Sequence, residues 1–150
     1  MFATRKPTRI PKYDYTSDNY YFITICTHEK ECIFGTVEQL NQLGEIAMQD
    51  LQNIENCYEG VRIDNCIVMP NHIHAIIVLE NANTSLNQVI GLYKSGVSRK
   101  IRKIVPDMLV WQRSYHDHII RNQAAYEKIW NYVQFNGEKW KEDCFFPGDY

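Results

Sequence analysis

Two strand-forming runs separated by only two residues constrain the fold of this chain more than any other feature. The runs are Val61–Met69 and His72–Leu79, both rich in β-branched residues, and Pro70-Asn71 lies between them. So short a connection allows only an antiparallel hairpin. A third run of the same kind, Tyr20–Cys26, predicts another strand.

Helical spacing follows the strands Tyr20–Cys26 and His72–Leu79. Apolar positions recur every three or four residues over 38–57, and residues 85–105 are also predicted to be helical, although two glycines weaken the second pattern. A short strand is expected over 115–120. Asn122 can then cap a last helix that runs to Asn136, where Gly137 is a natural stop.

The predicted order is therefore strand, helix, strand, strand, helix, strand, helix. Three of the strands and the first two helices match the split β-α-β plan of a ferredoxin-like sheet. We expect an α+β fold in which a ferredoxin-like antiparallel sheet carries helices packed on one face. Residues 1–18 are expected to form a basic N-terminal arm and residues 19–150 a single catalytic domain, since 150 residues suit one domain.

Composition narrows the class of protein. No apolar run approaches the roughly 18 residues of a membrane span, and the N-terminus has no secretion signal, so we expect a cytoplasmic protein with no membrane partner. The five cysteines form no Cys-x-x-Cys pair and predict no zinc site.

Net charge is only −2, but residues 1–13 hold four basic side chains and residues 81–106 five, with no acid in either stretch. This segregation favours a basic face on a nearly neutral protein.

The hairpin carries the first candidate site. Side chains alternate across a strand, so His72 and His74 point to one face, with Cα atoms roughly 6.5 Å apart. Two imidazoles so placed can converge on one cation with bonds of about 2 Å. The alternative is a pair of ordinary histidines on a solvent-facing strand.

The last predicted helix carries the second candidate. Tyr132 and Asn136 are four residues apart and share a helix face, and Lys128 lies one turn earlier on it. An apolar stripe on the same helix is predicted to dock on the sheet, formed by Tyr126, Ile129, Trp130 and Val133.

These motifs together resemble a known family. Pro70-Asn71-His72-Ile73-His74 resembles the HUH motif of small transposases, in which U is a bulky apolar residue. The string Trp111-Gln112-Arg113-Ser114-Tyr115-His116-Asp117-His118-Ile119-Ile120-Arg121-Asn122 resembles the segment before the catalytic helix of REP-associated tyrosine transposases, and Tyr126-x5-Tyr132-x3-Asn136 fits that helix. The chain thus resembles the REP-associated, single-tyrosine HUH transposases of small insertion sequences over residues 9–140.

The resemblance implies a role for each matching position. His72 and His74 match metal-binding histidines, Tyr132 the nucleophilic tyrosine, and Asn136 a polar residue that completes the metal site, although many relatives read Asn-Pro where this chain reads Asn136-Gly137. It implies a Mg²⁺ or Mn²⁺ cofactor and cleavage and rejoining of DNA through a 5′-phosphotyrosine. The implied partner is single-stranded or hairpin DNA, bound by a monomer or a homodimer.

Several alternatives stay open from the sequence. Tyr115 is the second candidate nucleophile and Tyr126 the third, while His116 and His118 could be a second metal pair, DNA contacts or structural. The chain could also be a replication-initiator nuclease of the same chemistry, or a domesticated hairpin-binding protein without cleavage.

Candidate DNA-binding residues come from the basic stretches and their neighbours: Arg5, Lys6, Arg9, Lys94, Arg99, Lys100, Lys103, Arg113 and Arg121. Trp111 is predicted either to stack on bases or to be partly buried in the core.

Overall fold

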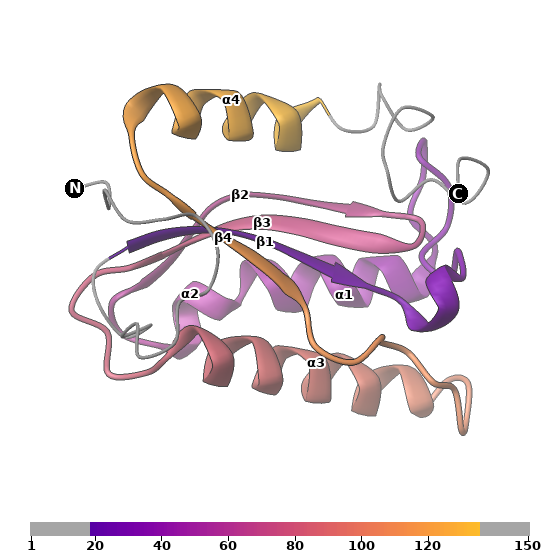
Figure 1. Ribbon diagram of the computed structural model, residues 1–150. Helices are drawn as coiled ribbons and strands as arrows, with labels where there is room; N and C mark the ends of the chain where they lie inside the picture. The colour runs from indigo at the N-terminus through magenta and orange to yellow at the C-terminus, as the bar shows by residue number, and fades with distance from the viewer. Residues whose placement is uncertain (1–18, 136–150) are drawn as a thin grey trace.

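The computed structural model describes residues 19–135, which form one antiparallel sheet of four strands (Figure 1). The strands are β1 (Asn19–Cys26), β2 (Val61–Met69), β3 (His72–Leu79) and β4 (His116–Ile120). Their order across the sheet is β2-β3-β1-β4, and every neighbouring pair is antiparallel. This order confirms the ferredoxin-like sheet and the hairpin predicted around Pro70-Asn71. The predicted arm, residues 1–18, lies outside the described residues.

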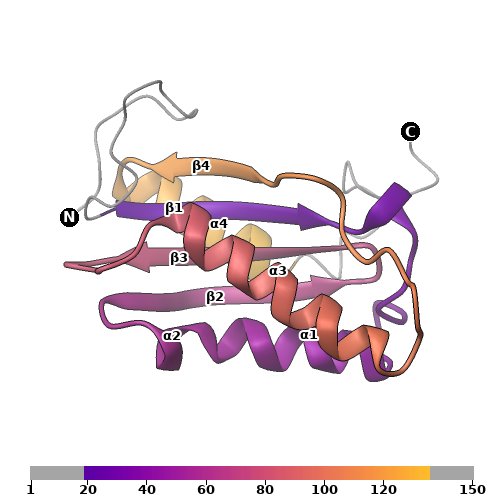
Figure 2. The ribbon, with the colours of Figure 1, turned by 90° about the horizontal axis from the view of Figure 1, so that it is seen from below.

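Helices cover both faces of this sheet (Figures 1 and 2). The helices α1 (Gln42–Gln52), α2 (Ile54–Cys57) and α3 (Leu86–Arg102) lie together on one face, as expected. The last helix, α4 (Gln123–Gln134), crosses the opposite face alone. A short 3-10 helix, η1 (His28–Lys30), follows β1.

Capping side chains place the helix starts. Asn41 accepts a hydrogen bond from the Gly44 amide at the start of α1, and Ser85 accepts one from the Gln88 amide at the start of α3. The single helix predicted over 38–57 is wrong in extent, because it begins only at the Asn41 cap and is interrupted at Asn53, the residue between α1 and α2.

The sheet has an apolar core on each side. The larger core joins it to α1 and α3 and includes the side chains of β3 that alternate with the histidines: Ile73, Ala75, Ile77 and Leu79. The smaller core lies under α4 and is formed by Tyr20, Ile76, Val78, Ile120 and Val133. Because these side chains alternate along each strand, both faces can be apolar at once. In the part of the chain described, no helix is long and apolar enough to cross a bilayer.

Candidate active site

The two motif histidines lie on the face of β3 that α4 crosses. The ring centroids of His72 and His74 are 4.6 Å apart with an interplanar angle of 72°. The prediction that both rings share one face is therefore confirmed. The strand is not solvent-facing, because His72 is 0% exposed and His74 1% exposed.

Hydrogen bonds from neighbouring segments fix the rotation of both rings. His72 Nδ1 lies 2.8 Å from Asn71 Oδ1, and the Asn71 Nδ2 group donates to the Lys30 carbonyl at 3.2 Å. Since the amide nitrogen of Asn71 is used for donation, its oxygen accepts from His72 Nδ1–H. In a neutral ring, that tautomer puts the lone pair on His72 Nε2, the nitrogen through which the ring could hold a metal ion.

His74 is oriented from the next strand. Its Nδ1 lies 2.9 Å from the buried Thr24 hydroxyl of β1, which pairs directly with His74 in the sheet register. Phe22, two residues earlier on β1, stacks on the His74 ring at 5.2 Å between centroids. When Nδ1 donates to Thr24, His74 Nε2 also keeps its lone pair.

Tyr132 on α4 reaches this pair within the same chain. Its hydroxyl lies 3.5 Å from His74 Nε2, and its ring lies 5.3 Å from the His74 ring and 6.0 Å from that of Phe22. Tyr132 is 36% exposed, so a partly exposed residue stands beside a buried imidazole. The geometry brings together three of the four residues predicted for the catalytic and metal site. The fourth, Asn136, lies outside the described residues.

Contacts to β2 hold α4 in this position. The Tyr126 hydroxyl donates to Asp64 Oδ2 at 2.9 Å, and Asn65 Nδ2 donates to the Trp130 carbonyl at 3.2 Å. Burial, followed by the hydrogen bond to Asp64, raises the pKa of Tyr126 to about 12. Asn122 caps the helix by accepting from the Ala125 amide. The apolar stripe predicted to dock on the sheet is thus in contact with it.

The other two candidate tyrosines lie in different surroundings. Tyr126 is bound to Asp64, as described, and Tyr115 packs against the larger core, its hydroxyl bonded to Asn87 Oδ1. Asn87 belongs to α3, on the face of the sheet away from the histidine pair. Neither tyrosine has the combination of imidazole contact and exposure found at Tyr132.

The histidines of β4 extend the same face. His116 is paired with Thr24 and His118 with Phe22 across the sheet. Thr24 and Phe22 both contact His74, so the two histidines of β4 lie on the same face of the sheet as the active site. His116 is exposed and His118 half-buried. Burial first, then the nearby Arg121 cation, lowers the pKa of His118, while Asp117 opposes the shift.

The two histidines could supply only part of the coordination shell of a divalent cation. Within residues 19–135, no group of three or more His, Cys, Asp or Glu side chains is arranged to hold a metal ion. His72 and His74 can each offer one imidazole nitrogen, which leaves the other positions to oxygen ligands such as Asn136 and a phosphate. Mg²⁺ and Mn²⁺ prefer oxygen-rich, six-coordinate shells. Two histidine nitrogens would leave the remaining positions of such a shell to oxygen ligands.

The predicted DNA-binding residues divide into several groups. Arg5, Lys6 and Arg9 lie outside the described residues. Lys94 and Lys100 are already engaged, Lys94 by two backbone carbonyls and Lys100 by Asp50 at 2.6 Å. Lys103 is exposed and Arg121 half-buried.

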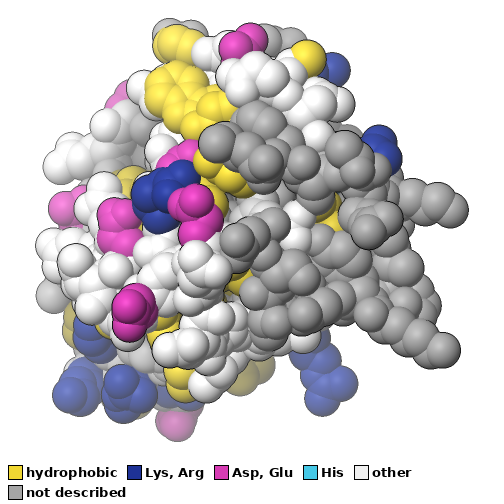
Figure 3. Space-filling model, turned by 90° about the vertical axis from the view of Figure 1, so that its left-hand side faces the viewer, with side chains coloured by type: hydrophobic (Ala, Val, Ile, Leu, Met, Phe, Trp, Pro, Cys, Tyr) yellow, Lys and Arg dark blue, Asp and Glu magenta, His cyan; other side chains and the backbone are white. Residues whose placement is uncertain are grey.

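The remaining two, Arg99 and Arg113, line one pocket together with Arg102, which the sequence prediction left out. The helical spacing of positions 95, 98, 99 and 102 was the available signal for Arg102. Dark-blue basic side chains also gather along the lower edge of the molecule, the side of the α1–α3 layer, when it is viewed from one end (Figure 3).

Comparison with known proteins decides the family. A family profile described as "Transposase IS200 like" matches residues 15–136, most of the chain. The chain belongs to the IS200-like transposase family. An uncharacterised protein of Haemophilus influenzae Rd is 34% identical to this transposase over 167 residues, covering 95% of this chain and 93% of the relative.

Two solved structures share the fold of this transposase. One is a REP-associated tyrosine transposase bound to a REP hairpin, with a TM-score of 0.63 and 16% identity, covering 85% of this chain and 72% of that one. The other is a candidate transposase from Deinococcus radiodurans R1, with a TM-score of 0.57 and 14% identity, covering 84% and 95%. Membership of a transposase family confirms a DNA-processing enzyme, and these two likenesses confirm the fold.

Proposed function

We propose that this transposase is a metal-dependent enzyme that cleaves and rejoins single-stranded DNA at hairpin-containing repeats through a 5′-phosphotyrosine. The observation that carries the proposal is that Tyr132, a partly exposed residue, places its hydroxyl 3.5 Å from His74 Nε2. A nucleophile beside a pair of imidazoles suits attack on an anionic phosphodiester, which otherwise repels nucleophiles.

The bonds balance without an external energy source. Tyr132 Oη forms a bond to the phosphorus, the bond from phosphorus to the 3′ oxygen breaks, and the leaving oxygen takes a proton as a 3′-hydroxyl. The phenol proton passes to solvent, to which Tyr132 is partly exposed. The reverse reaction with another 3′-hydroxyl rejoins the strands, because the phosphotyrosine retains the phosphodiester bond energy.

The neighbouring residues prepare the site for this chemistry. His72 and His74 would hold a divalent cation, which, when bound, neutralises charge on the scissile phosphate. Asn71 and Thr24 orient the two rings, and their burial keeps bulk water from competing for the ring nitrogens. Lys128, exposed one turn before Tyr132, would favour the phenolate by its charge.

The substrate proposal draws on the fold neighbours. The REP-associated relative is described in complex with a REP hairpin, and this chain shares its fold. We therefore take a DNA hairpin with single-stranded flanks as the substrate. The site is complete within one chain as far as His72, His74 and Tyr132 are concerned, which suits action as a monomer as well as a homodimer.

A labelled-hairpin assay tests the proposal. A 5′-phosphotyrosine retains the DNA on the 3′ side of the cut, so with Mn²⁺ a 3′-labelled substrate should become protein-bound on a denaturing gel. A 5′-labelled substrate should instead release a shorter free strand. Tyr132→Phe should remove both signals, whereas Tyr115→Phe, a control whose hydroxyl contacts Asn87 on the other side of the sheet, should retain them.

The outcomes also separate the rival functions. Binding of the hairpin with no adduct in the wild type would favour a domesticated binding protein. An adduct that never transfers to an added 3′-hydroxyl strand would favour a nuclease of the replication-initiator type. Retention of the adduct by Tyr132→Phe would reject Tyr132 as the nucleophile.

A further inference from the structure

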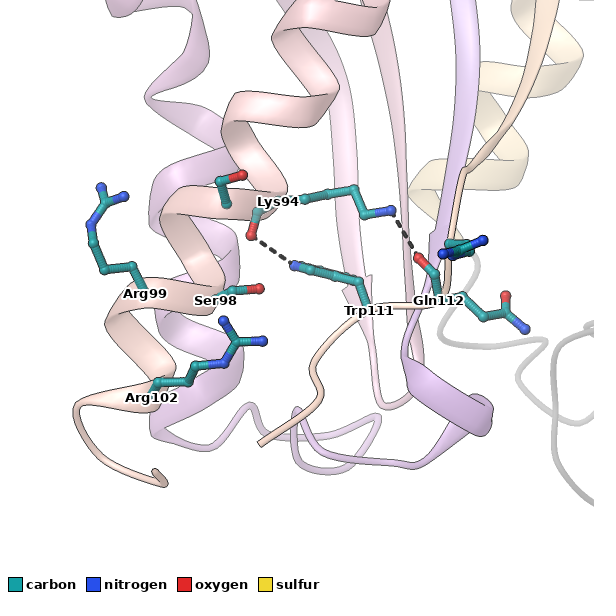
Figure 4. A pocket seen from close by; sticks show the side chains of 8 residues that line it. Lys94, Ser98, Arg99, Arg102, Trp111 and Gln112 are labelled. Carbon is teal, nitrogen blue, oxygen red and sulfur yellow. Dashed lines mark hydrogen bonds between the residues drawn. The ribbon is translucent and has the colours of Figure 1, made fainter. Parts of the chain in front are cut away.

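A basic pocket lies on the side of the molecule that the active site does not use. It has a volume of about 530 Å³ and lies between α3 and the segment that leads into β4 (Figure 4). Half of its lining residues are basic and none is acidic. The basic ones are Lys94, Arg99, Arg102 and Arg113, and Ser95 and Ser98 also line the pocket. Its volume falls in the range of about 300–1,000 Å³ typical of small-molecule sites.

Hydrogen bonds fix one wall of the pocket to α3. The Lys94 ammonium donates to the Gln112 carbonyl at 2.8 Å, and Trp111 Nε1 donates to the Lys94 carbonyl at 3.1 Å (Figure 4). The Lys94 ammonium also donates to the Ser114 carbonyl at 2.8 Å. The Gln112 amide also donates to the carbonyl of Cys26, at the end of β1. Burial lowers the pKa of Lys94, which acts as a structural link rather than as a free surface cation.

The three arginines supply the charge that remains available. Arg99 and Arg113 are exposed on opposite walls, and no ion pair joins either one to a residue within 19–135. Arg102 donates through Nε to the Met108 carbonyl at 3.0 Å, so its terminal nitrogens remain to face a ligand. Guanidinium groups arranged around a hollow with serine hydroxyls suit a phosphate group.

Trp111 adds an aromatic surface to this charge. Its ring packs against Phe34 and Tyr93, with centroids 5.6 Å and 5.9 Å away, and its ring N–H is already donated. What Trp111 presents to the pocket is therefore ring surface. Proteins that bind single strands commonly stack bases on such rings.

We propose that this pocket binds one unpaired nucleotide of the DNA substrate, with its phosphate on the arginines and its base on Trp111. The Trp111 ring lies between α3 and the 112–114 segment. A base within a duplex is stacked between its neighbours, so it cannot stack on this ring. Only two residues separate Arg113 from His116, which pairs with Thr24, the contact of His74. A single strand leaving the pocket past Arg113 is thus led toward the histidine face. The identity of the polymer as DNA rests on the proposed function.

Binding measurements on the full chain in EDTA test the pocket apart from cleavage. The probes are a fluorescent oligothymidylate, an abasic oligomer with the same number of phosphates, and a blunt-ended duplex without a loop. Arg99→Gln and Arg113→Gln should each weaken oligothymidylate binding about tenfold and reduce the slope of log affinity against log salt by about 0.7. Lys30→Gln, the same charge change outside the pocket, should leave this binding unchanged. Binding of the blunt-ended duplex should change less than twofold in all variants.

The base contact has its own readout. Wild type should bind oligothymidylate at least about fivefold more tightly than the abasic oligomer. Trp111→Leu should abolish that preference, and its unfolding curve shows whether it has folded. Equal binding of both oligomers by wild type overturns the base contact even if Trp111→Leu fails to fold.

Three further results would overturn the pocket as a whole. They are unchanged oligothymidylate binding by both arginine variants, equal losses in Lys30→Gln, and competition by an acidic peptide as strong as that by oligothymidylate. Loss of binding in the arginine variants, together with a wild type that forms no adduct, would reject the proposed function while supporting the pocket.

Discussion

Replacing Thr24 with valine removes the hydroxyl that contacts His74 Nδ1 while keeping a β-branched side chain of similar size. Both partners are buried, with Thr24 4% and His74 1% exposed, and the contact is 2.9 Å long. A buried group that loses such a partner costs about 1–3 kcal/mol, so the free energy of unfolding should fall by that amount in EDTA. Loss of an outer contact to a ligating histidine typically weakens metal binding about 10–100-fold, and Mn²⁺ affinity should fall accordingly.

Urea unfolding in EDTA and calorimetric titration with Mn²⁺ measure the two quantities. Thr84→Val is the matched control, since the Thr84 hydroxyl is also largely buried and donates to Gln88 Oε1 at 2.8 Å, at the start of α3 rather than beside the histidines. It should lose stability but keep the wild-type Mn²⁺ affinity. Unchanged Mn²⁺ affinity in Thr24→Val, alongside lost stability, would refute the claim that Thr24 orients a metal ligand.

Three other perturbations test separate parts of the account. Asp64→Asn should lower the pKa of Tyr126 from about 12 and loosen α4, as measured by absorbance titration of the tyrosines and by proteolysis of the helix; an unchanged titration would contradict the Asp64 contact. The pKa of His118 is lower in the folded chain than in the unfolded one. When the pH drops below the ordinary histidine pKa near 6.5, the unfolded chain therefore binds more protons, and the free energy of unfolding decreases as the pH decreases. His118→Gln should therefore lose less stability than wild type between about pH 7 and pH 5, as urea unfolding would show; equal losses would contradict this. Saturating Mn²⁺ should raise the unfolding midpoint of wild type, because it binds only the folded state, and His72→Ala should show no such rise; an equal rise in both would place the ion elsewhere.

Local patterns were sufficient to predict much of this molecule. The two-residue connection at Pro70-Asn71 dictates the hairpin, and strand alternation alone puts His72 and His74 on one face. The docking of α4 follows from its apolar stripe. Each of these properties depends on residues that are close together in the sequence.

The partners that complete the site lie far away in the chain and could not be predicted. Thr24 meets His74 across 50 residues, and Asp64 meets Tyr126 across 62, because of strand register and helix docking. The basic stretch of α3 shows the same limit. Its charges predicted DNA contacts, yet Lys94 and Lys100 are held by partners within the protein.

Locating the DNA attachment on the polypeptide tests the central claim most directly. Trypsin separates the three candidate tyrosines, since Tyr115 lies in peptide 114–121, Tyr126 in 122–128 and Tyr132 in 129–139. After reaction with a hairpin substrate and nuclease digestion, mass spectrometry should find the residual nucleotide on peptide 129–139. Its appearance on either of the other two peptides would contradict the assignment of Tyr132 as the nucleophile.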